Sequence, residues 1–176
     1  MTDAEPVADA SRSVVVREAR TSDVVAIRTL VDTYTEDRIL LAKATVTLYE
    51  DVQEFYVAEV DGRVVGCGAL HVLWEDLAEV RTLAVEPAHR GHGLGHLLLQ
   101  RLVRQAREVG VTRLFTLTFE TDFFSRHGFR EIEGIPVAHD VFEQLLQSYD
   151  EGVAEFLGLE RVKPNTLGNS RMLLRL

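Results

Sequence analysis

Three glycines at alternate positions, Gly91, Gly93 and Gly95, follow an apolar run that ends at Pro87. Proline cannot donate to a strand ladder, so a strand should end before it. An apolar helical pattern begins close behind the glycines, near Leu97. A strand, a glycine turn and a helix start direct free N–H groups and the positive end of a helix at one point. Glycine also permits a left-handed turn and close approach of a ligand. The segment therefore predicts an anion site, most naturally for a phosphate.

Known phosphate-binding patterns restrict the choice of ligand. The pattern G-x-G-x-x-G fails because His96 stands where the third glycine is required, and no Gly-Lys-Ser/Thr of a P-loop follows. The run from Arg90 to Gly95 instead fits R/Q-x-x-G-x-G/A, which resembles the acetyl-CoA pyrophosphate loop of the GNAT N-acetyltransferases. The resemblance implies that the pyrophosphate is bound by Arg90, Gly91, His92, Gly93, Leu94, Gly95 and His96.

The composition bounds the class of protein. A chain of 176 residues suits one domain that buries about 70% of its unfolded surface. A net charge of −9 argues against nucleic acid as the main partner, since phosphate backbones need clustered cations. A single cysteine, Cys67, excludes an internal disulfide and favours a reducing compartment. Without a signal-like start or a run of about 20 apolar residues, we expect a cytoplasmic protein without membrane contact, and a homodimer stays open.

Periodicity predicts one domain over residues 14–176 behind a disordered tail at 1–13. Asp61-Gly62 between two apolar runs predicts a hairpin with a type I′ turn. The order of elements favours an α/β (α+β) fold, a single twisted mixed β-sheet with helices on both faces. Strands are expected at 14–17, 55–60, 63–70, 78–86, 112–119, 129–133 and 171–176, and helices at 24–34, within 36–50, and at 93–109, 121–127 and 141–149.

This order resembles the GNAT layout along nearly the whole chain. Residues 16–23 are similar to the family's opening "IRPAxxxD", and residues 57–70 are similar to its "vAe…ivGcaaL" hairpin. Residues 123–129 resemble its "FYEKxGF" segment. The resemblance implies a GNAT domain that uses acetyl-CoA as a co-substrate.

Acetyl transfer requires a held thioester, a deprotonated amine and stabilisation of an oxyanion. The resemblance implies that pantetheine lies along Leu83, Ala84 and Val85, and that the Val85 amide polarises the thioester carbonyl. Alternation along a strand predicts that Glu79 and Arg81 share a face with Leu83 and Val85. Glu79 is then the candidate base and Arg81 an anchor for a substrate carboxylate. The alternative is an exposed ion pair of little energetic value.

Two features near the predicted cofactor site bear on the mechanism. Many GNAT members carry Tyr at the position of Phe124 as an acid for the leaving thiolate, and Phe cannot donate. That role falls to water or to another group such as Ser125, while Phe124 and Arg126 are expected to border the cofactor. His92 and His96 have a metal-like i, i+4 spacing, but the glycines make this segment a turn, so no metal is expected.

The segments 39–43, 66–70, 78–85 and 168–173 are similar to the acetyltransferase domain of N-acetylglutamate synthases, specifically the short stand-alone bacterial type. The similarity implies substrate-carboxylate contacts from Lys43, Arg81, Ser170 and Arg171, while Gly168 replaces an expected Arg. It covers only the catalytic domain, and we expect no amino-acid-kinase-like domain in 176 residues. The implied reaction is acetyl-CoA-dependent N-acetylation of L-glutamate in a ternary complex, the first step of arginine biosynthesis.

Other functions stay open at this point. The missing Arg leaves glutamine as an alternative to glutamate. The amine could instead belong to a protein N-terminus or to a polyamine, which would require an acidic pocket. Because Phe124 cannot act as an acid, the chain could also be a non-catalytic regulatory module that binds acyl-CoA.

Overall fold

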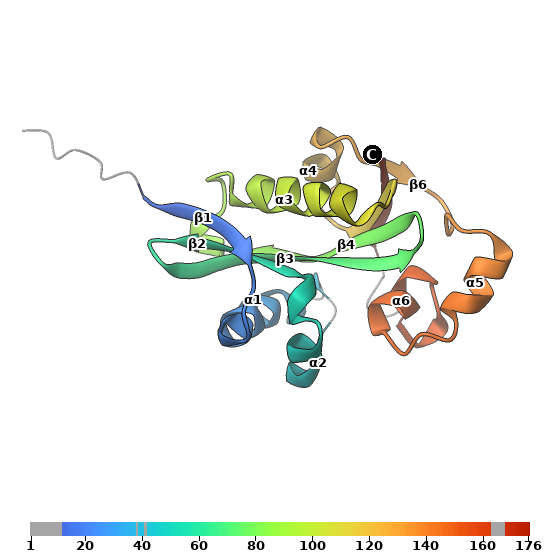
Figure 1. The fold of residues 1–176 in the computed structure, drawn as a ribbon, viewed down its shortest axis with the longest axis horizontal. Coiled ribbons are helices and arrows are strands. Elements are labelled where there is room, and N and C mark those ends of the chain that lie inside the picture. Colours follow the sequence, from blue (N-terminus) through green and yellow to red (C-terminus); the bar gives the residue numbers. More distant parts are fainter. Residues whose placement is uncertain (1–11, 38, 41, 163–167) are drawn as a thin grey trace, which may run out of the picture.

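The protein is described by a computed structural model that covers residues 12–37, 39–40, 42–162 and 168–176. One seven-stranded sheet runs through its middle, with helices on both faces (Figure 1). The strands are β1 (Val14–Glu18), β2 (Phe55–Val60), β3 (Arg63–Trp74), β4 (Leu77–Val85), β5 (Arg113–Thr118), β6 (Arg130–Ile132) and β7 (Ser170–Arg175). The α-helices are α1 (Val24–Thr35), α2 (Thr45–Glu50), α3 (Leu94–Val109), α4 (Thr121–Arg126), α5 (His139–Leu145) and α6 (Glu151–Phe156).

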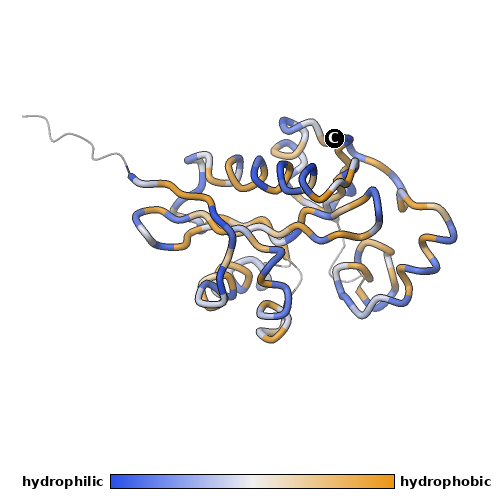
Figure 2. Tube along the Cα trace, in the orientation of Figure 1, coloured by the Kyte–Doolittle hydropathy of each residue, from blue (hydrophilic) through white to orange (hydrophobic). Residues whose placement is uncertain are grey.

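The sheet is mixed, which confirms the predicted fold class. Its strand order is β1-β2-β3-β4-β5-β7-β6, with β4 and β5 parallel and every other neighbouring pair antiparallel. Helices α3 and α4 cover one face, and α1 and α2 cover the other (Figure 1). Hydrophobic strand segments lie between the helices (Figure 2). Each helix carries both hydrophobic and hydrophilic residues, as expected of a helix with one buried side. Burial of both sheet faces explains why the middle strands are almost continuously apolar.

The hairpin between β2 and β3 forms as predicted. Asp61 and Gly62 both have positive φ, 51° and 78°, as a type I′ turn requires. β3 continues to Trp74, beyond the predicted end at Leu70. The long strand gives β4 a partner along almost its whole length.

A bulge interrupts β4 at Thr82, whose φ is 56°. The register passes from Cys67 opposite Ala84 to Ala69 opposite Arg81, so β4 carries one extra residue there. The extra residue reverses the alternation of side chains beyond it. Val80 and Leu83 both pack in the core beneath α3, whereas Arg81 points to the other face.

The predicted common face of Glu79, Arg81, Leu83 and Val85 is therefore wrong. Leu83 and Val85 face the core under α3, while Glu79 and Arg81 face the opposite side, towards α6. Strict alternation predicts a common face only for an uninterrupted strand.

Cys67 lies directly beside this bulge. Its side chain is fully buried, and its thiol donates to the Thr82 carbonyl with a sulfur–oxygen distance of 3.5 Å. Burial raises the pKa of the Cys67 thiol to about 12. With no basic neighbour in sequence, Cys67 is expected to be a small buried hydrophobic residue, and its burial confirms this.

The C-terminal third differs most from the predicted elements. The helix expected at 141–149 is instead α5, from His139 to Leu145, and α6 follows it without having been predicted. Gly152 lies inside α6 and weakens its sequence signal. Lys163, Pro164 and Asn165 also predict a turn from the sequence, but these residues lie outside the described ranges, as does most of the predicted tail at 1–13.

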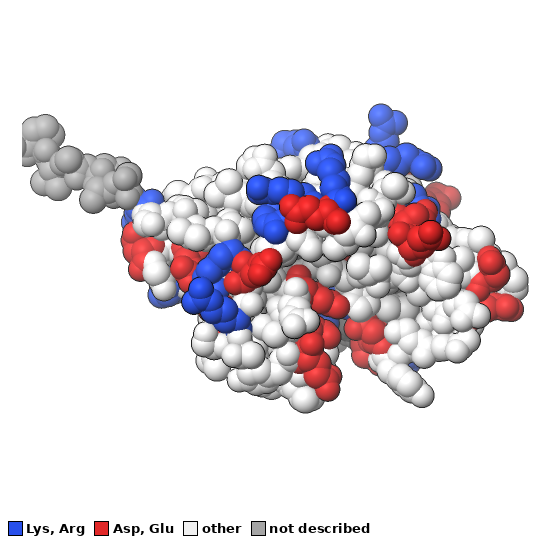
Figure 3. All heavy atoms as spheres, in the orientation of Figure 1, with Lys and Arg blue, Asp and Glu red and all other residues white. Residues whose placement is uncertain are grey.

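Charges on the surface are mixed in sign. On the face shown in Figure 3, Lys and Arg side chains are interspersed with Asp and Glu. Among the helices in the described ranges, none is both long and apolar enough to cross a membrane.

Gly68 lies opposite the bulge and gives a test of the packing there. A Cβ at this position would lie 2.9 Å from Leu83 Cδ1 and 3.0 Å from Leu102 Cδ1. Because Leu102 is fully buried, Gly68→Ala should lower the free energy of unfolding by about 1–3 kcal/mol, measured by urea denaturation. Gly95→Ala is the control, since its Cβ would come no closer than 3.6 Å to any atom. Equal stability of the two variants would contradict tight packing at the bulge.

Candidate active site

A cleft opens where the parallel strands β4 and β5 separate. Their pairing joins Leu77, Ala78 and Glu79 to residues 113–115, and the register stops at Glu79. Beyond it, a cleft of about 700 Å³ lies between the two strand ends. It is lined by β4 residues 80–85, by the glycine loop, by residues 116–120 and by α4. The parting of two strands leaves this edge of β4 available to a ligand.

The glycine loop forms the start of α3 at one end of the cleft. Gly91 and Gly93 have φ of 79° and 81°, the left-handed region that glycine adopts without strain. Gly93 is the N-cap of α3, a helix of 16 residues. A Cβ at either glycine would meet no atom within 4 Å. Glycine is therefore required here by the left-handed backbone and not by lack of space. The N-terminus of α3 faces the cleft, where its free N–H groups could bind an anion.

Most of the predicted pyrophosphate contacts border this cleft. The lining includes Arg90, Gly91, Gly93, Leu94, Gly95 and His96, as well as Leu83, Ala84, Val85, Phe124 and Arg126. His92 is not among the described lining residues. Leu94 is 2% exposed and packs in the core, so its main chain is the part available to a ligand.

Arg90 is tied to the end of β4 through Tyr34 of α1. Arg90 Nε donates to the Tyr34 hydroxyl at 3.0 Å, and the guanidinium lies over the Tyr34 ring. The Tyr34 hydroxyl in turn donates to the carbonyl of Val85. Tyr34 was not predicted as a site residue, because only the fold brings α1 to the glycine loop. This chain of contacts fixes the loop relative to β4.

Two histidines meet at the border of the cleft. His127 Nδ1 donates to the Phe123 carbonyl at 2.8 Å, and His127 Nε2 lies 2.6 Å from His96 Nδ1. With the exposed Arg126, they add basic groups between α3 and α4. Among the described residues, no group of three or more His, Cys, Asp or Glu could hold a metal ion.

Phe124 borders the cleft as a core residue. It is 4% exposed and makes edge contacts with Phe123 and Phe129, each at a centroid distance of 5.1 Å. It offers no proton to a leaving group. Ser125, the predicted alternative donor, is exposed and does not line the cleft.

A second, smaller pocket of about 50 Å³ adjoins the cleft. Both cavities are bordered by Ile39, Leu40, Val80, Arg81, Thr82 and Leu117. The pocket alone is bordered by Lys43, Glu79, Gly152, Glu155 and Asn169. Of the predicted substrate contacts, Lys43 and Arg81 line it, whereas Ser170 and Arg171 do not. The cavities thus meet at the bulge of β4.

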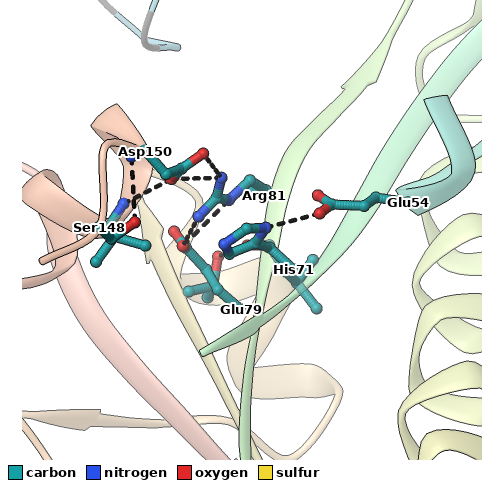
Figure 4. Close-up of polar contacts among 9 residues, drawn as sticks. Glu54, His71, Glu79, Arg81, Ser148 and Asp150 are labelled. Atoms are coloured by element: carbon teal, nitrogen blue, oxygen red, sulfur yellow. Dashed lines mark hydrogen bonds and ion pairs between the residues drawn. The ribbon is translucent and has the colours of Figure 1, made fainter. Parts of the chain in front are cut away.

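Arg81 of β4 is joined to Glu79 and to Asp150, the N-cap of α6, by the contacts drawn in Figure 4. Its Nη2 and Nε donate to one oxygen of Glu79 at 3.0 and 3.2 Å, and its Nη1 donates to both oxygens of Asp150 at 2.9 and 3.1 Å. A Cβ at Gly152 would lie 2.6–2.8 Å from the guanidinium atoms, so only glycine lets α6 come this close. The predicted anchor for a substrate carboxylate is already engaged by two protein carboxylates.

Burial and attraction oppose each other in this network. Burial lowers the pKa of Arg81, but attraction to Glu79 and Asp150 outweighs it and leaves the pKa above its ordinary value. Burial raises the pKa of Asp150, but Arg81 and the Val153 N–H that it caps outweigh it, so the pKa lies below its ordinary value. Both groups are therefore charged near neutral pH.

Glu155 of α6 lines the same pocket and was missed by the sequence analysis. Burial, followed by repulsion from Glu79, raises the pKa of Glu155 to about 7. The Asn169 side chain donates to Glu155 Oε1 at 3.4 Å. No local pattern marks this residue, because its environment comes from β4 and from the segment before β7.

Arg171 and Ser170 lie behind the pocket on β7. Arg171 lies over the Phe115 ring and donates to the Glu155 and Gly134 carbonyls, both at 3.4 Å. Burial lowers the pKa of Arg171. Ser170 pairs with Thr118 in the ladder between β5 and β7. Neither side chain contacts the pocket in this arrangement, and their predicted substrate contacts stay a prediction.

Comparison with known proteins identifies the family and the fold. The model of the acetyltransferase (GNAT) family matches residues 24–130, more than half of the chain. The chain belongs to the GNAT acetyltransferase family. The match begins at α1 and ends at β6, so it includes the bulged strand, the glycine loop and α4.

Curated relatives match a longer part of the chain than the family model does. An amino-acid acetyltransferase of Mycobacterium tuberculosis is 64% identical over 163 residues, which are 91% of this chain and 93% of that protein. An amino-acid acetyltransferase of Pseudomonas putida is 35% identical over 70% of this chain, but only 30% of its own length is matched.

Solved structures agree with the GNAT fold. A Mycobacterium tuberculosis protein crystallised with CoA and the ligand NLQ is 64% identical, with a TM-score of 0.89 over 92% of this chain and 99% of that one. The N-acetylglutamate synthase of Neisseria gonorrhoeae, in complex with coenzyme A and N-acetyl-glutamate, is 26% identical with a TM-score of 0.74, over 93% of this chain and 35% of that one.

Gly93 provides a test of the anion site in this GNAT cleft. Gly93→Ala forces a Cβ into a left-handed conformation at the start of α3, at a cost of about 1–2 kcal/mol. We expect CoA to bind about tenfold more weakly by calorimetry. Gly110→Ala is the matched control, because Gly110 has φ of 95° at the other end of the same helix and does not line the cleft. Equal losses of affinity in both variants would argue against binding at the N-terminus of α3.

Proposed function

We propose that this GNAT protein transfers the acetyl group of acetyl-CoA to the α-amino group of an amino acid, L-glutamate or L-glutamine, in a ternary complex. The observation that carries this proposal is the junction of the two cavities at β4 residues 80–82. A thioester along the open edge of β4 and an amine in the small pocket then meet at the bulge. Such a junction supports direct attack, because the two reactants would lie next to each other there.

The relatives support the choice of substrate class. The Mycobacterium relative is named an amino-acid acetyltransferase, and the Neisseria synthase was crystallised with coenzyme A and N-acetyl-glutamate. The reaction proposed here would be the first step of arginine biosynthesis.

The cofactor is proposed to lie along the cleft. Its pyrophosphate binds the N–H groups at the start of α3, with charge from Arg90 and Arg126. Its pantetheine bonds to the main chain of residues 83–85, where β4 has no pairing with β5. The Val85 amide, or one beside it, is the proposed donor to the oxyanion, a role worth about 10²–10³ in rate.

The amino acid is proposed to bind at the small pocket and the adjoining end of the cleft, because a pocket of about 50 Å³ alone is too small to hold it. Glu79 receives the amine and accepts its proton, directly or through a water. Lys43 attracts a substrate carboxylate, and Arg81 adds positive charge while it holds Glu79 in place. Arg171 donates to carbonyls through long hydrogen bonds of 3.4 Å, which a substrate carboxylate can replace. With Phe124 unable to donate, the CoA thiolate leaves by taking a proton from water.

The proposal is tested by the release of free CoA thiol from acetyl-CoA across a panel of amines. We expect turnover with glutamate or glutamine and none with polyamines or N-terminal peptides. If only a polyamine or a peptide were acetylated, the proposed amino-acid substrate would be wrong and that amine would take its place. A raised melting temperature with acetyl-CoA but no thiol release from any amine would instead favour a binding module.

Replacement of Glu79 tests its role. Glu79→Gln keeps the shape of the side chain but cannot accept a proton, so kcat should fall by about 10²–10⁴. The affinity for acetyl-CoA, measured by calorimetry, should not change. Glu75→Gln replaces an exposed carboxylate in the turn before β4 and should keep wild-type kcat. An unaltered kcat in Glu79→Gln would remove Glu79 as the base.

A further inference from the structure

Helix α6 places a second carboxylate on the pocket that receives the amine. Glu155 on α6 and Glu79 on β4 both line this pocket, and the two carboxylates repel each other. Their positions depend on Gly152, which lets α6 lie against the Arg81 guanidinium. The fold therefore brings together two acidic groups that are far apart in the sequence.

The two carboxylates have unequal partners. Glu79 Oε2 accepts from two nitrogens of Arg81, and both side chains are less than 9% exposed. Glu155 accepts one long hydrogen bond, from the neutral Asn169 amide. Within the described residues, no Lys, Arg or His forms an ion pair with the Glu155 carboxylate. The negative charge on Glu79 is compensated, and that on Glu155 is not.

Two neighbouring carboxyl groups in different surroundings differ in how tightly they bind a proton. In such a pair the uncompensated member holds a proton more tightly than the compensated one. The raised pKa of Glu155, about 7, agrees with this geometry. A group of that kind can take up and release a proton near neutral pH.

We propose that Glu155 is the proton-accepting partner of Glu79, so that the two carboxylates together hold the proton removed from the substrate ammonium, with Glu155 as its resting place. This inference rests on the proposed function. Glu79, the proposed base, contacts the ammonium group and passes its proton on to Glu155.

The step conserves atoms and charge. One proton leaves the substrate nitrogen and is held by the carboxylate pair, which leaves a neutral amine with a free electron pair. That pair forms the N–C bond to the thioester carbon, and collapse of the tetrahedral intermediate breaks the C–S bond. The second proton of the nitrogen passes to a water, and the departing thiolate takes a proton from water to become the free CoA thiol. The carboxylate pair returns its proton to solvent before the next turnover.

Several charged groups surround Glu155 and shape its titration. Glu79 opposes its ionisation, and Arg81 and Arg171 favour it. Lys43 lines the same pocket. Because Arg81 is held by Glu79 and Asp150, it favours ionisation of Glu155 without an ion pair.

The pH profile of kcat/KM tests this assignment. In the wild-type protein, the rate should fall as the pH drops through about 7, because the protonated pair cannot accept another proton. Glu155→Gln should lower kcat/KM at pH 8 by about 10²-fold and remove the inflection near pH 7. Glu155→Asp should restore part of the rate together with the inflection. The matched control is Glu151→Gln, an exposed carboxylate on the same helix, which should keep the wild-type profile.

A measurement of stability separates this inference from the proposed function. Between the ordinary pKa of Glu and about 7, the folded protein binds more protons at Glu155 than the unfolded chain, so stability falls as pH rises through that window. Glu155→Gln does not lose stability in this way as the pH rises. The Tm of the variant minus the Tm of the wild type should therefore be larger at pH 8 than at pH 5. This readout needs no substrate.

The outcomes are therefore distinct. Absence of turnover with every amino acid, together with the expected Tm difference, would overturn the proposed function and with it the proton transfer. Wild-type rates in Glu155→Gln, or an inflection near pH 7 that persists in it, would overturn the assignment of Glu155 while the proposed function stands. A Glu155→Gln variant with lower Tm at both pH values and a persisting inflection would assign Glu155 a structural role, which also overturns the proposal.

Discussion

The left-handed residue Thr82 is the constraint on which the rest of the site depends. A β-branched residue in this conformation is strained by about 1–3 kcal/mol and persists only when its surroundings fix it. Here the Cys67 thiol donates to its carbonyl, and Gly68 leaves space opposite the bulge. The bulge shifts the alternation of side chains along β4, so that Glu79 and Arg81 face α6 while Leu83 and Val85 face α3. Without it, strict alternation would put Glu79 and Arg81 on the same face as Leu83 and Val85.

Local signals explain which parts of the molecule could be predicted from the sequence. Asp61-Gly62 predicts its turn because few dipeptides adopt two positive φ angles. The loop from Arg90 to Gly95 is similarly explicit, since a strand, glycines and a helix follow one another along the chain. Both features depend on residues that are close in sequence, and both were predicted correctly.

Other features depend on contacts between distant segments and leave no local pattern. Thr82 is neither glycine nor asparagine, so nothing in the sequence indicates a left-handed residue there. Glu155 resembles any solvated glutamate until α6 packs against Arg81, and Asp150 resembles an ordinary helix cap until it binds the same guanidinium. Residues that line the cleft could be predicted where the motif is contiguous, whereas residues whose environment is created by tertiary packing could not.

The single cysteine has a practical consequence for work with this protein. The nucleophile that reacts with thiol reagents is the thiolate. A fully buried thiol with a pKa of about 12 forms almost no thiolate while the chain is folded. Coloured disulfide reagents that detect liberated coenzyme thiol will thus give little background from the native enzyme. Because Cys67 lies beside the bulge, its labelling rate also reports how often the centre of the sheet opens, without any engineered probe.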